Sequence, residues 1–228
     1  MHLLAAILIV ATLIVPAPPE KGSAPASPVR NFPPRPMTAD EQSLLADAGR
    51  AFALGDHARC LKMLEGVDGV SAAHPGLLNL RGAILCETGR VREAVPYFEW
   101  AVEADPGHFW ANFSLAECAL LDGDLARARN RFLRIPVTTP DERDLVALKL
   151  VLIDIRAGDK ESARRQLPPW LPASAAGYAA YAAYAAYAHA EGAPSRHSAL
   201  LAKGRAAYPG GFSLFLKKTL EESGIPAE

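Results

Sequence analysis

The sequence repeats itself with a period of about 34 residues, and this repetition limits the possible folds more than any other feature. Residues 75–106 serve as the reference segment. Its matches one period downstream pair Gly89 with Gly123, Ala94 with Ala128, Phe98 with Phe132, and Pro106 with Pro140. Its matches one period upstream are Ala48 for Gly82, Gly55 for Gly89, Cys60 for Ala94 and Leu64 for Phe98. A period of this length is typical of helix pairs that stack on their neighbours.

Each repeated residue type has a physical role in such a pair. Gly82 and Ala94 are small, so the two helices approach closely there, and Phe98 fills the space that they leave. A glycine recurs where each first helix should end in a left-handed residue. Proline is expected to stop the second helix. The helix-ending glycines are Gly55, Gly89, Gly123, Gly158 and Gly192.

A helix–turn–helix period with a small residue early, Ala and Phe four residues apart, and a final Pro resembles the tetratricopeptide repeat. The resemblance implies an all-α fold, an α-solenoid of about five repeats in residues 38–222. The expected units are about 41–74, 75–108, 109–142, 144–177 and 178–211, followed by a capping helix at 212–222. The match is partial, because the aromatic residue usual early in the first helix is replaced by Leu78 and Asn112.

Several segments predict local structure within these units. Thr38 and Glu41 match a capping box at the start of the first helix. Residues 145–158 are apolar on nearly every side, which indicates a helix buried on more than one face. The tyrosines of residues 178–187 recur every third residue and drift around a helix by about 60° each. We therefore expect some of them to be packed and others to lie at the surface.

The N-terminus predicts a targeting or anchoring segment. Its apolar run, Leu3 to Val15, is too short for the roughly 30 Å hydrocarbon core unless its flanks are included, so residues 1–17 are a signal peptide or membrane anchor. Residues 18–37 form a proline-rich linker that acts as a spacer. We expect an exported or membrane-tethered protein of the periplasm or cell envelope. A cytoplasm-facing anchor remains the alternative, because positive charges follow the run: Lys21, Arg30 and Arg35.

Charge and motifs argue against several function classes. The chain has 24 basic and 25 acidic residues, so it offers no electrostatic case for nucleic acid, and we expect membrane contact only through the N-terminal segment. Residues 127–134 contain four arginines, Arg127, Arg129, Arg131 and Arg134, which we interpret as a solvated helix face rather than a nucleic-acid site.

We expect no enzyme, no cofactor and no metal. The chain lacks a phosphate-binding glycine loop, a His-Glu-x-x-His motif and a Cys-x-x-Cys motif. His57 and Cys60 have the spacing of half a metal site, but two ligands do not complete one. The remaining histidines lack an evident partner: His108, His189 and His197. The cysteines fall one per repeat, as small core residues do: Cys60, Cys86 and Cys118.

The resemblance also implies a binding groove lined by the first helices. Its family positions correspond here to Leu45, Phe52, Asn79, Cys86, Trp110, Phe113, Glu117, Leu120, Leu145, Leu148, Leu152 and Ile155. Large aromatics dominate binding energy, so Trp110 and Phe113 are either the anchors for a partner or packing residues between the second and third units. The leading hypothesis is a non-catalytic scaffold or adaptor that holds a partner's helix or peptide. The alternative is a self-associating component, a homo-oligomer, of a cell-envelope assembly or secretion system.

Overall fold

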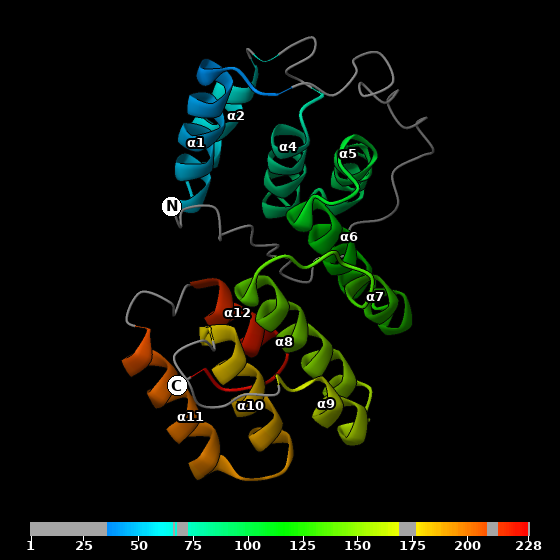
Figure 1. Cartoon of the computed structure of the whole chain (residues 1–228), viewed down its shortest axis with the longest axis vertical. Helices are drawn as coiled ribbons and strands as arrows, with labels where there is room; N and C mark the ends of the chain where they lie inside the picture. The colour runs from blue at the N-terminus through cyan, green and yellow to red at the C-terminus, as the bar shows by residue number, and fades with distance from the viewer. Residues whose placement is uncertain (1–35, 66, 68–72, 169–176, 209–213, 228) are drawn as a thin grey trace. The chain divides into compact units, whose positions relative to one another are not determined.

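The computed structural model describes residues 36–65, 67, 73–168, 177–208 and 214–227. This part of the chain contains eleven helices and no strand (Figure 1). The all-α fold is therefore confirmed, and the succession of helix pairs is consistent with an α-solenoid of helical repeats. Contacts divide the chain into two compact units, Met1–Asp124 and Leu125–Glu228, called unit 1 and unit 2 below.

Unit 1 begins with two helix pairs, α1 with α2 and α4 with α5, and α6 packs on α5 and α4. The helix bounds are Ala39–Ala53 (α1), His57–Glu65 (α2), Pro75–Glu87 (α4), Val91–Ala104 (α5) and Phe109–Leu121 (α6). The predicted capping box is confirmed: the Thr38 side chain accepts from the Glu41 amide, and the Glu41 side chain accepts from the Thr38 amide. Both bonds satisfy amides that have no partner inside the helix.

Unit 2 is organised around α8, which packs on α7, α9 and α10. Its helix bounds are Leu125–Phe132 (α7), Pro140–Arg156 (α8), Lys160–Gln166 (α9), Tyr178–Ala190 (α10), Pro194–Ala207 (α11) and Leu214–Glu222 (α12). Every residue of α8 from Leu148 to Asp154 is buried. The prediction of a helix buried on more than one face is thus confirmed.

The turn between the helices of each pair is the same throughout the chain. All five predicted glycines have positive φ, between 75° and 79°. At Gly89, the glycine amide donates to Cys86 and the next amide, Arg90, donates to Leu85. This pair of bonds is a Schellman motif, and it recurs at each of the other glycines. Gly224, at φ 73°, forms a sixth such turn after α12, so α12 ends in the way that the first helix of a pair does.

The expected close approach of small residues to Phe98 is also observed. A Cβ added to Gly82 of α4 would lie 2.6 Å from the Phe98 ring of α5. In unit 2, Gly204 of α11 has a similar role, since its Cβ would lie 3.0 Å from the Tyr178 ring. The tyrosines of α10 divide as predicted: Tyr178 and Tyr187 are buried, whereas Tyr181 and Tyr184 are half-buried.

The junction between α7 and α8 differs from the prediction. Pro140 was expected to stop the second helix of the third repeat, residues 109–142. In the structure, α7 already ends at Phe132, and Pro140 is the first residue of α8. Proline fits the first helical position because its missing amide would have no partner there. Thr139 and Glu142 form a capping box that the sequence analysis missed, and α8 begins before the expected boundary at 144.

Some predictions fall outside the described residues. These are the apolar segment 1–17 and the linker up to residue 35. Among the helices that are described, none combines the length and the apolar character that crossing a bilayer requires.

Replacing Gly89 with alanine should destabilise the fold by about 1 kcal/mol, because a left-handed backbone is strained for a residue with a Cβ. A Cβ at this position meets no atom within 4 Å, so the loss would come from the backbone alone. Gly89→Asn should lose less, since asparagine tolerates this conformation. Urea unfolding of the three proteins tests this, and equal midpoints would contradict it.

Candidate protein interface on the first helices

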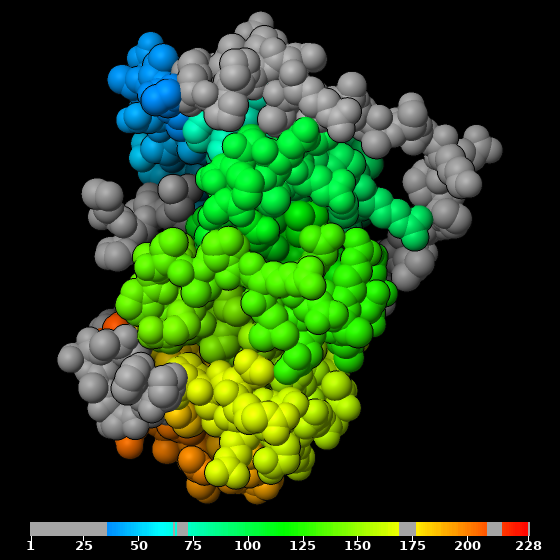
Figure 2. Space-filling view, turned by 45° about the vertical axis from the view of Figure 1, so that its right-hand side comes forward, coloured from blue at the N-terminus to red at the C-terminus, as the bar shows by residue number. Residues whose placement is uncertain are grey.

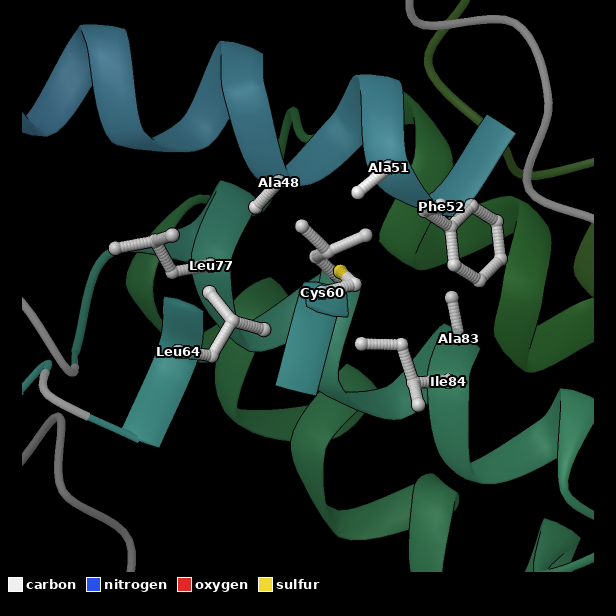
Figure 3. Packing of buried hydrophobic residues seen from close by; sticks show 9 residues of the cluster. Ala48, Ala51, Phe52, Cys60, Leu64, Leu77, Ala83 and Ile84 are labelled. Carbon is white, nitrogen blue, oxygen red and sulfur yellow. The ribbon is translucent and has the colours of Figure 1, made fainter. Parts of the chain in front are cut away.

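The side of α4 assigned to the interface carries small residues. Asn79 and Cys86 were predicted there, and Gly76 and Ala83 lie one repeat period before Trp110 and Glu117. Bulkier residues of the neighbouring helices pack over this region: Phe52 belongs to the same buried cluster as Ala83, and Leu45 and Trp110 pack against that cluster. Figure 3 shows Phe52 of α1 beside Ala83 of α4. The chain therefore fills part of the predicted groove with its own side chains.

Asn79, the polar residue predicted for this surface, makes a contact inside unit 1. It is buried, and the Ser114 hydroxyl of α6 donates a hydrogen bond of 3.5 Å to its amide oxygen. Because Asn79 and Ser114 lie about one repeat period apart in the sequence, this bond joins the first helices of consecutive repeats.

The first turn of α6 carries an aromatic cluster of Phe109, Trp110 and Phe113. Its ring centroids lie 5.0 to 5.9 Å apart, within the usual range for aromatic pairs. Phe113 is only 2% exposed, whereas Trp110 is half-buried. Trp110 thus presents part of its ring to solvent and is held by two aromatic neighbours. Phe113 offers almost no surface in this conformation, and its role in binding stays a prediction.

The other predicted interface residues differ in exposure. Leu148 and Leu152 of α8 are 0% and 4% exposed, so they pack inside unit 2. Leu145 is buried as well, and Ile155 is half-buried. In unit 1, four of the predicted residues are half-buried and so remain partly accessible to solvent. We call these four residues the half-exposed set: Leu45, Trp110, Glu117 and Leu120.

Histidine caps were missed by the sequence analysis. His108, expected to lack a partner, is the N-cap of α6, and its Nδ1 accepts from the Ala111 amide at 3.1 Å. His74, one repeat period earlier, caps α4 in the same way through the Gly76 amide. Burial lowers the pKa of His108, which Asp105 raises and His74 lowers further. The sequence signal for these caps was a histidine that recurs one repeat period apart, each time just before a helix.

His189 and His197 were also treated as separate, but the α10–α11 turn brings their rings to 5.4 Å between centroids. His197 is buried, and its Nδ1–H donates to the Ala185 carbonyl at 2.8 Å. His57 packs against the Phe52 ring, and Cys60 lies in the core cluster. Among the described residues, no group of three or more His, Cys, Asp or Glu side chains is arranged to hold a metal ion.

Charge is distributed unequally between the two units. Unit 1 has 9 basic and 15 acidic residues, a net charge of −6, whereas unit 2 has 15 basic and 10 acidic residues, a net charge of +5. The near-neutral total conceals this difference. On α7, Arg129 pairs with Asp154 of α8 at 2.7 Å. Arg134 and Arg164 are exposed and form no ion pair with the rest of the described chain. The yellow surface in Figure 2 includes α9, which carries Arg164.

Comparison with known families matches residues 85–152 to the tetratricopeptide repeat. The matched segment runs from the end of α4 into α8. No curated protein and no solved structure gives a significant match. Residues 85–152 therefore carry the pattern of the tetratricopeptide repeat, as the repeated residues indicated. Repeats of this family generally mediate protein–protein interactions and are typically non-catalytic.

Lowering the pH should destabilise the protein partly through His108. Folding lowers the pKa of His108 below its ordinary value of 6.5, so the unfolded state takes up a proton first as the pH falls. The contribution of His108 to the free energy of unfolding is complete above the ordinary pKa of 6.5. It is lost as the pH falls through the lower pKa of the folded state. Protonation of Nδ1 would also remove the bond to Ala111.

The matched control is His108→Asn, because asparagine caps helices without titrating. Urea unfolding at about pH 7.5 and about pH 5.5 should show a larger loss for the wild type than for the variant. Other titrating groups are common to both proteins. Equal losses in the two proteins would contradict this role of His108.

Proposed function

We propose that this protein is a non-catalytic scaffold or adaptor that binds a helix or peptide of another protein through the half-exposed set of α1 and α6. The observation that carries the proposal is Trp110, a half-exposed aromatic side chain held between Phe109 and Phe113. A ring that is already ordered loses little conformational entropy when a partner covers it. Tryptophan is also among the residues that most often dominate interface energies.

The chemistry of the half-exposed set indicates the kind of partner. Leu45 and Leu120 add apolar surface beside Trp110. A segment with apolar anchors would complement this surface. Recognition of a C-terminal carboxylate is a poor fit, because Asn79 is buried and bonded to Ser114.

We further propose that the protein acts outside the cytoplasm, tethered to or exported across a membrane. The apolar run from Leu3 to Val15 supports this location, and residues 18–37 would act as the spacer between the membrane and the repeats.

Photo-crosslinking in the native cell tests the proposed interface. A photoreactive residue at position 120 should crosslink to a foreign protein. Trp110→Ala should lower the yield of that adduct by about tenfold, as the loss of a binding hot spot would. The matched control is Trp100→Ala, because Trp100 is a half-buried tryptophan of α5 that packs against Tyr97 and on a different hydrophobic cluster from Trp110.

Both variants should keep the helical content of the wild type by circular dichroism. Equal losses of adduct in the two variants would contradict the role of Trp110. Adducts with the same chain alone would replace the adaptor hypothesis with self-association.

The opposite charges of the two units favour self-association as a second candidate function. A basic surface of one copy would face an acidic surface of the next, in a head-to-tail contact that can continue into longer assemblies. Such attraction between exposed charges is weakened by salt.

Two double variants with the same total charge separate this effect from net charge. Arg134→Glu with Arg164→Glu lowers the positive charge of unit 2 and should weaken association. Lys62→Glu with Arg92→Glu makes unit 1 more acidic and should preserve or strengthen it. Sedimentation velocity from about 20 mM to about 300 mM NaCl measures the association of the wild type and of both double variants. Monomers at every salt concentration, or the same response from both variants, would exclude self-association through these charges.

A further inference from the structure

Cys86 and Cys118 lie together in the core of unit 1. Cys86 is the penultimate residue of α4 and Cys118 lies in the last turn of α6. Both belong to one buried cluster with Ala94, Phe98 and Leu115, and they are 0% and 3% exposed. Cys60 belongs to a different cluster, packed between α1, α2 and α4. The sequence pattern indicated three equivalent core cysteines, but the fold brings two of them into one cluster.

The ends of α4 and α6 bring the two thiols into the same buried cluster. A hydrogen bond with Cys118 is the main cause that raises the pKa of the Cys86 thiol, and burial and the nearby Glu87 and Glu117 carboxylates raise it further. All three cysteines are free in this structure. Both thiols therefore lie, unpaired by a disulfide, in one buried cluster between the ends of two first helices.

We propose that Cys86 and Cys118 form a reversible disulfide that joins α4 to α6 when the protein meets a disulfide oxidant. The oxidant is a disulfide-bearing compound, either a small molecule such as oxidised glutathione or a disulfide-bearing protein. One cysteine sulfur attacks the oxidant, breaks its S–S bond and forms a mixed disulfide. The second cysteine then attacks the mixed disulfide and closes the intramolecular bond. Two thiols of the chain are oxidised, and the disulfide of the oxidant is reduced to two thiols.

The pairing would have two consequences for unit 1. It closes a loop of about 30 residues that contains all of α5, which limits the freedom of the unfolded chain. It also fixes the ends of α4 and α6 relative to each other, next to Glu117 of the half-exposed set. Because both thiols are buried, the reaction requires local opening and should be slower than the oxidation of an exposed thiol. The inference does not depend on the proposed binding function.

The experiment uses the reduced full chain, incubated with oxidised glutathione under native conditions. Mass spectrometry of the intact chain should show the loss of two hydrogens, and peptide mapping without reductant should link Cys86 to Cys118. Cys60 should remain available for alkylation. Cys60→Ala should form the same bond, whereas Cys118→Ala should form no intramolecular disulfide. Oxidation should raise the urea midpoint of the wild type and of Cys60→Ala, but not that of Cys118→Ala.

Oxidation in concentrated urea shows which cysteines pair when the chain is unfolded. It should give several different disulfides, including some that contain Cys60. A native chain that keeps three free thiols, or that links Cys60 as often as the other two, would overturn the proposal. Mixed disulfides with glutathione as the only product would overturn it as well.

Discussion

The left-handed glycine turn is the constraint on which the remaining structure depends. At each turn, the two Schellman bonds satisfy carbonyl groups at the end of the first helix, and the positive φ of glycine reverses the chain direction within a few residues. The second helix then returns along the first, so a small residue such as Gly82 meets a large one such as Phe98. Without the turn, this register would not be fixed.

The packing of small side chains against large ones also determines which surface remains accessible to a partner. The predicted interface positions of α4 are small, and the resulting space is covered by Phe52, Leu45 and Trp110 from its neighbours. Close packing is required there, because an unfilled void costs stability. Residues that would be anchors in an open groove, Phe113 among them, are therefore used largely for packing. The half-exposed set is what this packing leaves accessible, which narrows the proposed interface to a few residues of α1 and α6.

The sequence predicted the features that depend on local structure. The glycine turns, the Thr38 capping box, the buried α8 and the two classes of tyrosine in α10 are confirmed, because periodicity and backbone preference determine them. The features that depend on neighbouring elements were missed. The exposure of Phe113 depends on the residues around it, and the Cys86–Cys118 contact joins the first helices of two different repeats without any local motif. The opposite charges of the two units were hidden because the total charge averages over both.

The proposed interface requires a partner protein to cover α1 and α6 of unit 1. Hydrogen exchange of the full chain can be compared for the chain alone and for the chain with the protein captured by the crosslinking probe at position 120. Exchange should become slower in residues 39–53 and 109–121, with little change in α7 and α9. Unchanged exchange in α1 and α6, or slower exchange confined to α7 and α9, would contradict the proposed interface.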